Sequence, residues 1–361
     1  MELEKIIREQ FNNIITKDEL DKITNRASKI TGGLTEEFSI SNILDKTLEG
    51  KSIFSQSDII ASLENLITLE VRNALIISVE ILSICIIIGI LKGLSSSFNS
   101  KSVADMSLIV CSMIIIGISI NSFKMTYNIA IEAVSIMSNI MMIIMPMLIG
   151  ILMATGLITS GTILSPLIIG SITFISYLIK KMIFPSLFIA TILALLNCLT
   201  EKNYVNKLSK LLRNISVGLV GFIVVILTGI ISIQGLLTET SDGILINTTK
   251  FSLSNFIPIV GNFTSDTIGL FLQCMGSIKS IVGIFGIIVL VLIMSIPIIK
   301  ILLIALIYKL TAAVAEPVTS SKISDGLNDM GSSLVSIASI LFFNSLLFII
   351  FISIIINIGG S

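Results

Sequence analysis

Three charged side chains lie inside apolar stretches of the sequence: Glu80, Asp266 and Lys300. A lone charge at the centre of a membrane-spanning helix costs roughly 2.5–3.5 kcal/mol on insertion scales, so such a residue is expected to face a bundle interior, a cavity or a partner. Glu80 is the seventh residue of its apolar stretch, and Lys300 lies between uncharged runs of 20 and eight residues. The sequence therefore offers Glu80 and Lys300 as an ion pair at depth, either inert or part of a translocation path.

The residue types that carry catalysis are missing or lie outside any motif. The chain has no histidine, which excludes Ser-His-Asp and Cys-His nucleophile arrangements and an HExxH zinc helix. It contains neither a GxxxxGK[ST] phosphate loop nor a GxGxxG dinucleotide motif, and its four cysteines form no CxxC pair. Asp105 and Asp266 lie in dissimilar, motif-free surroundings, which argues against an aspartic-protease pair. We therefore expect a protein that is not an enzyme and has no catalytic, cofactor-binding or metal-binding residues.

The composition indicates a protein dissolved in lipid. Of 361 residues, 54% are hydrophobic and 13% are charged, whereas soluble domains have about 45–50% apolar and about 25% charged residues. The mean hydropathy is +1.03. The 23 basic side chains balance the 23 acidic ones, so no net charge attracts the chain to nucleic acid. These numbers exclude a soluble globular enzyme and a disordered chain.

The charges divide the chain into two regions. Residues 1–73 hold nine of the 23 basic and 13 of the 23 acidic side chains, and residues 1–30 have apolar positions at helical spacing between them. We therefore predict an amphipathic helical N-terminal segment, residues 1–73. It is either a solvated or interface-lying cap or a docking arm for a partner. The polytopic membrane domain is expected over residues 74–361.

The membrane domain is expected to be an all-α bundle of transmembrane helices. A spanning helix needs about 20 mostly apolar residues, and this criterion gives eight spans, with seven or nine as alternatives. The uncharged run 133–179 is too long for one crossing and is divided near Gly156–Gly161. Residues 251–276 are apolar but interrupted, and are expected to be re-entrant. The eight expected spans are 74–91, 106–123, 133–156, 161–179, 182–199, 215–237, 281–308 and 331–358.

A basic amphipathic segment, residues 201–214, separates two of these spans. Its four basic residues alternate with valine and leucine, so we expect a helix lying on a membrane surface. The positive-inside rule places it on the cytoplasmic side. The basic residues are Lys202, Lys207, Lys210 and Arg213.

Two parts of the sequence resemble each other at an offset of about 112 to 116 residues. Residues 208–220 align without gaps to residues 323–335. The segment that ends at Pro146 parallels the one that ends at Pro258, and the helix-kinking Pro185 and Pro297 each follow 39 residues later. Either Ile-rich sequence matches itself by chance, or residues 125–237 and 240–358 are duplicated halves. A duplication favours a second function, a self-sufficient secondary transporter with a midplane site at the repeat interface.

Four long stretches of the sequence carry a family resemblance: KLSKLLRNIS at 207–216, GIISIQGL at 229–236, FSLSNFIPIVGNFTSDTIGLFLQC at 251–274 and IPIIKILLIALIYKLTAAVAEPVTSSKISDGLNDMGSSL at 296–334. They resemble the stage III sporulation protein AE family of endospore-forming Firmicutes. The resemblance extends over about residues 38–358, in order and spacing. Members of this family typically begin with a cleavable signal peptide, whereas this sequence starts at MELEKIIREQ.

The resemblance implies a role that composition does not supply. Members of the family belong to a multi-protein, secretion-like channel between mother cell and forespore, which sustains forespore development. They are multi-pass proteins of the outer forespore membrane, on the mother-cell side. The partners implied are a cytoplasmic ATPase, small membrane subunits, ring-forming proteins and a forespore-membrane partner. The resemblance carries over no catalytic residues.

Overall fold

The computed structural model describes residues 68, 71–72, 75–90, 101–199, 205–256, 261–319 and 321–358. These residues form helices joined by short turns, with no strand among them, which confirms the all-α expectation. Five of the helices are long and apolar enough to cross a membrane. A shorter apolar helix, Leu75–Ile90, precedes them. Most of the N-terminal segment 1–73 lies outside the described residues.

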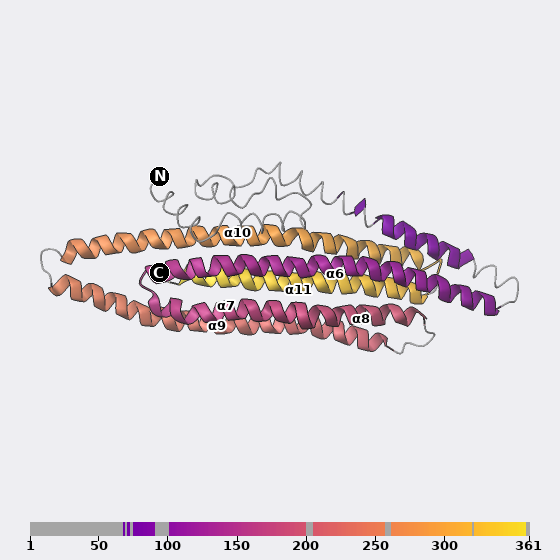
Figure 1. Cartoon of the computed structure of the whole chain (residues 1–361), viewed down its shortest axis with the longest axis horizontal. Coiled ribbons are helices and arrows are strands. Elements are labelled where there is room, and N and C mark those ends of the chain that lie inside the picture. The colour runs from indigo at the N-terminus through magenta and orange to yellow at the C-terminus, as the bar shows by residue number, and fades with distance from the viewer. Residues whose placement is uncertain are drawn as a thin grey trace.

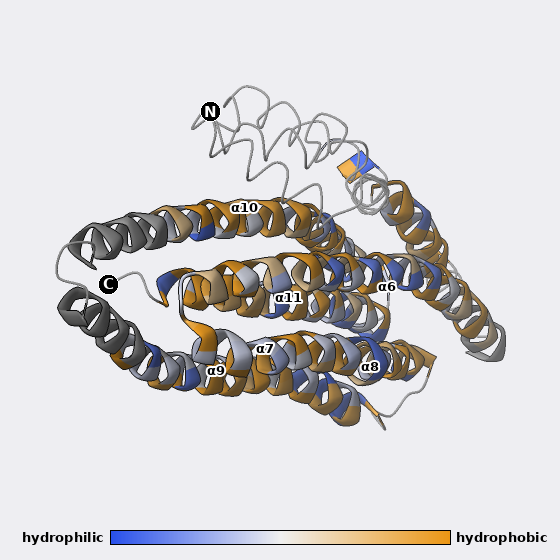
Figure 2. Cartoon of the chain, turned by 60° about the vertical axis from the view of Figure 1, so that its left-hand side comes forward, coloured by the Kyte–Doolittle hydropathy of each residue, from blue (hydrophilic) through white to orange (hydrophobic). Residues whose placement is uncertain are grey.

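The helices lie side by side as an elongated bundle (Figure 1). Long stretches of α9 and α10 are hydrophobic (Figure 2), as expected of helices that contact lipid. In chain order the elements are α6 (Lys101–Ala154), α7 (Ile158–Leu178), the π-helix η1 (Ile179–Ile183), α8 (Phe184–Leu196), the short 3-10 helix η2 (Asn197–Leu199), α9 (Asn206–Phe256), α10 (Gly261–Ala315) and α11 (Ser321–Asn357).

The prediction of eight spans is not confirmed, first because α6 joins two of the expected spans. The spans 106–123 and 133–156 were separated at Lys124 and Glu132, but α6 runs through both residues as one helix of 54 residues. Both charged side chains are exposed on its outer face, so the chain does not have to leave the helix to solvate them. At 1.5 Å per residue α6 is about 81 Å long. Because the hydrocarbon core is about 30 Å thick, part of α6 lies outside it.

The spans expected at 161–179 and 182–199 are also one rod, because α7 and α8 are joined by a π-helix. Pro185 has no N–H, and its ring excludes the carbonyl four residues earlier. The turn before it widens, and the Phe184 N–H donates to the Ile179 carbonyl five residues back. The expected break near Gly156–Gly161 is found, since α6 ends at Ala154 and α7 begins at Ile158.

The basic segment 201–214 is not a separate surface helix. From Asn206 onward it forms the first turns of α9, which continues without a break to Phe256. Residues 251–276 are not a re-entrant segment in their described part: they include the end of α9 and the start of α10. Pro258 lies outside the described residues.

The core of the bundle is built around α11, which packs against α6, α8, α9 and α10. Half of the most apolar window of α11 is buried, against 22% of the corresponding window of α9. Ile337, Phe348 and Phe351 are among the side chains of α11 with no exposed surface. The central position of α11 and the outer position of α9 leave the long face of α9 for lipid or a partner.

The internal repeat stays a prediction, with one matching contact in its favour. Ser209 donates to the Ala190 carbonyl at 2.7 Å, and its aligned partner Ser324 donates to the Ala312 carbonyl at 2.9 Å. The prolines do not match in the same way. Pro185 lies five residues before Ala190, whereas Pro297 lies 15 residues before Ala312.

The turn between α6 and α7 requires a glycine. Gly156 has a φ of 86°, a region that costs a residue with a side chain about 1–2 kcal/mol. We expect Gly156→Ala to lower the free energy of unfolding by about this amount, measured as the thermal midpoint of the circular-dichroism signal in detergent.

Gly150 is the matched control, because it lies inside α6 and a Cβ added there would meet no atom within 4 Å. Gly150→Ala should raise the midpoint, since alanine favours the helix by about 0.5–1 kcal/mol over glycine. A Gly156→Ala midpoint equal to or above that of the unaltered chain would contradict the turn geometry.

Candidate functional site

A buried carboxylate of α9 caps the start of α7. Asp242 has no exposed surface. Its Oδ1 accepts the Thr159 N–H at 3.0 Å and its Oδ2 accepts the Ser160 N–H at 2.7 Å. The N-cap residue of α7, Leu157, makes no side-chain cap hydrogen bond. The carboxylate therefore satisfies two N–H groups that the helix cannot pair itself, and its charge complements the positive end of the helix dipole.

A buried ammonium group of α10 binds the end of α11 at the same end of the bundle. Lys279 is 2% exposed, and its Nζ donates to the carbonyl of Ile358, the residue that follows α11. A cation at a helix C-terminus complements the negative end of the dipole. Asp242 and Lys279 thus belong to the two legs of one α9–α10 hairpin, and each leg holds the end of another helix.

An ion pair ties α9 to α11 near the opposite end. The Arg213 Nη2 lies 3.4 Å from Asp329 Oδ1, and the Arg213 Nη1 donates to the Asp329 carbonyl at 3.1 Å. The two side chains are 12% and 11% exposed. Arg213 is therefore not a surface charge, unlike the exposed Lys207 and Lys210 of the same helix. Lys202 lies outside the described residues.

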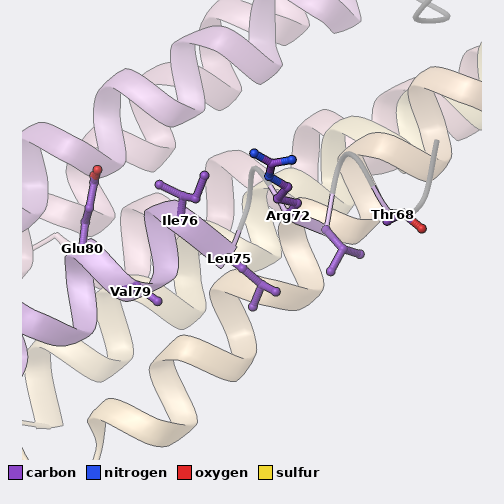
Figure 3. A pocket seen from close by; sticks show the side chains of 7 residues that line it. Thr68, Arg72, Leu75, Ile76, Val79 and Glu80 are labelled. Carbon is purple, nitrogen blue, oxygen red and sulfur yellow. The ribbon is translucent and has the colours of Figure 1, made fainter. Parts of the chain in front are cut away.

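Glu80 lies on the exposed side of the helix Leu75–Ile90, at one end of a shallow groove of about 690 Å³. Arg72, Ile76 and Glu80 follow one another at four-residue spacing and point to the same side of the helix (Figure 3). The groove is mostly apolar, with the anion Glu80 at one end and the cation Arg72 farther along it. Its described lining residues are Thr68, Val71, Arg72, Leu75, Ile76, Val79 and Glu80.

A hydrogen bond joins the helix of Glu80 to the helix of Lys300. Ser78, two residues before Glu80, shares a hydrogen bond of 2.6 Å with Thr311 of α10. Thr311 lies 11 residues beyond the half-buried Lys300, about 16 Å along the helix. The ion pair of Glu80 with Lys300 stays a prediction.

The remaining predicted positions fall at separate places in the bundle. Pro146 and Pro297 lie inside α6 and α10, and Pro185 lies in the first turn of α8. Asp266 lies in α10, and its side chain lies outside the described residues.

Sequence reasoning missed Asp242, Lys279 and the burial of Asp329. The sequences of α7 and α11, the helices that Asp242 and Lys279 cap, contain a signal that such caps are needed. The first turn of α7 contains no acidic residue and the last turn of α11 contains no basic residue, so a partner for each helix end had to come from elsewhere. Which helix supplies it depends on tertiary packing, which a single sequence does not give.

The chemistry of these contacts is that of binding and positioning. Within the described ranges no three side chains of His, Cys, Asp or Glu are grouped so that they could hold a metal ion. The charged groups that are buried are already engaged with helix ends or with each other. They fix how the helices are placed.

Long apolar helices whose ends are held by buried charges define an integral, multi-pass membrane protein. The sequence profile described as stage III sporulation protein AE matches residues 38–359. The chain therefore belongs to the stage III sporulation protein AE family, as its resemblance predicts. It is 29% identical over 344 residues to the stage III sporulation protein AE of Bacillus subtilis (strain 168), covering 95% of this chain and 86% of that protein. No solved structure matches the chain.

The capping role of Asp242 can be tested by hydrogen exchange. We expect Asp242→Ala to leave the Thr159 and Ser160 N–H groups unpaired, so peptides that cover the start of α7 should exchange faster and the chain should lose about 1–3 kcal/mol of stability. Ser241→Ala is the control, because the Ser241 side chain is exposed and bonds only within α9. Equal exchange in the two variants would contradict the cap.

The ion pair between α9 and α11 can be tested by a double-mutant cycle. Arg213→Met alone leaves Asp329 uncompensated, and breaking a buried pair in this way costs about 3–5 kcal/mol. Adding Asp329→Leu should recover much of that loss, as measured by thermal unfolding in detergent. Lys210→Met, one turn earlier and exposed, should change little. Additive losses in the double variant would show that the two side chains do not interact.

Proposed function

We propose that the chain is a non-enzymatic membrane subunit of the channel complex that links mother cell and forespore, and that forespore development requires it. The observation that carries the proposal is the family match over residues 38–359. The physical character of the chain agrees with it. A bundle of apolar helices whose sequence has no nucleotide-binding motif suits a conduit or platform that depends on other proteins for energy.

The partners we propose follow from the family and from that dependence. They are a secretion-type cytoplasmic ATPase, small membrane subunits, ring-forming proteins between the two membranes and a partner in the forespore membrane. The location we propose is the outer forespore membrane. The long outer face of α9, of which only 22% of the most apolar window is buried within the chain, is available for lipid or membrane subunits.

A secondary transporter is the alternative function, and the prolines within the helices favour it. Transporters of that class bind substrate near the bilayer midplane, where helices are broken and backbone carbonyls are freed. The helices here continue past the π-helix Ile179–Ile183 before Pro185 and past Pro297 inside α10, but each proline frees a backbone carbonyl. A transporter would act without the other proteins of the complex, which separates the two functions experimentally.

The proposed function predicts partner-dependent activity. Deleting the gene in its host should abolish heat-resistant spores, and a tagged chain should co-purify with a secretion-type ATPase from sporulating cells and not from vegetative cells expressing it. The matched control in both assays is the double variant Arg213→Met, Asp329→Leu, which changes contacts inside the bundle without removing the chain. Normal spore yield after deletion would contradict the proposal. Saturable, ion-coupled uptake by the purified chain in liposomes would establish the transporter instead.

A further inference from the structure

Asn344 is an unpaired polar side chain in the middle of the bundle. It lies on α11 and has no exposed surface. Among the described residues, neither its Oδ1 nor its Nδ2 has a hydrogen-bond partner. The α11 side chains around it, Ile337, Phe348 and Phe351, are equally buried. An amide that leaves water without gaining hydrogen bonds is strongly disfavoured, so the site needs a polar occupant.

Contacts between α10, α6 and α11 fix the height of Asn344 in the bundle. A Cβ at Gly286 of α10 would meet both Ile144 of α6 and Ile352 of α11, which places these two isoleucines at one height. Because α6 and α11 both run antiparallel to α10, eight residues back along each reaches Ile136 and Asn344. Asn344 therefore lies within a turn of Ser138, whose hydroxyl is hydrogen-bonded to that of Ser176 on α7.

The direction of the Asn344 side chain follows from helical geometry. At 100° per residue, Asn344 lies about 140° around the axis of α11 from Gly331 and about 160° from Ser324. Both of these residues contact α10, so Asn344 points away from that side. Phe343, the preceding residue, lies next to Gly221 of α9. The remaining neighbours of α11 on the buried side are α6 and the rod formed by α7, η1 and α8.

A backbone carbonyl without a helix donor lies at the same height. The Phe184 N–H donates to the Ile179 carbonyl, and Pro185 has no N–H. The Lys180 carbonyl therefore has neither the usual donor four residues on nor the π-type donor five residues on. The Lys180 ammonium lies 3.4 Å from the Ser135 hydroxyl of α6, which sets this carbonyl within about a turn of Ser138.

We propose that these groups form an internal water-binding site, which we name the Asn344 layer: the Asn344 amide, the Ser138 and Ser176 hydroxyls and the Lys180 carbonyl. A buried water needs two to four polar partners. The layer offers one amide N–H₂, an amide oxygen, a free carbonyl and the spare lone pairs of two hydroxyls. Water bound here donates to and accepts from groups that the chain leaves unpaired. It also gives the interior of a single chain a hydrated polar site, which a conduit for small polar solutes requires.

The test is water contact at the Asn344 side chain, measured by nuclear magnetic resonance on the full chain, labelled at asparagine and alanine and reconstituted in lipid nanodiscs. The Asn344 side-chain N–H₂ signal, assigned by its loss in Asn344→Ser, should receive magnetisation from water. The backbone N–H of Ala338 is the matched control, because Ala338 lies on the same helix, is 2% exposed and belongs to the apolar core. We expect transfer from water to the Asn344 N–H₂ and none to the Ala338 N–H.

Two results would overturn the proposal: no transfer from water to the Asn344 N–H₂, or equal transfer to the Asn344 N–H₂ and to the Ala338 N–H. The measurement uses the unaltered chain, and Asn344→Ser serves only to assign the signal. The readout does not depend on sporulation, so the layer and the proposed function can fail independently.

Discussion

Backbone hydrogen bonding in a medium without water is the constraint on which this structure depends. Within hydrocarbon every N–H and C=O needs a partner inside the protein, which leaves helices as the solution for a chain of this composition. A helix satisfies its own interior but leaves groups unpaired at each end. Asp242 and Lys279 supply partners for two such ends from neighbouring helices. The ends of the helices thereby become points where the tertiary structure is fixed.

The same constraint separates two kinds of charged residue. Lys124 and Glu132 lie on the outer face of α6, where their side chains can reach toward water or headgroups. Arg213 and Asp329 lie between helices and neutralise each other. A charged residue of the first kind allows one long helix to continue past it. A charged residue of the second kind determines which helices are neighbours.

Sequence reasoning recovered what composition and local chemistry determine. The apolar excess predicted an all-helical membrane protein, the glycines near Gly156 predicted the first turn, and long matching stretches predicted the family. It placed helix boundaries at Lys124 and Lys180, because a charge inside an apolar run reads as an interface. Both residues are helical in the structure, Lys124 in α6 and Lys180 in the π-helix η1, since a single long charged side chain does not break a helix. The pairing of Glu80 with Lys300 stays a prediction, because it depends on which helices are neighbours, which a single sequence does not contain.

The continuity of α6 through Lys124 and Glu132 is the central structural claim, and a spin-label distance tests it most directly. Labels at Met106 and Met142, both exposed, lie 36 residues apart on a cysteine-free chain in lipid nanodiscs. A continuous helix places their backbone positions about 54 Å apart. Two spans joined by a turn near Lys124 would bring the labels within roughly 20 Å across an antiparallel helix pair, and a distance in that range would contradict the fold described here.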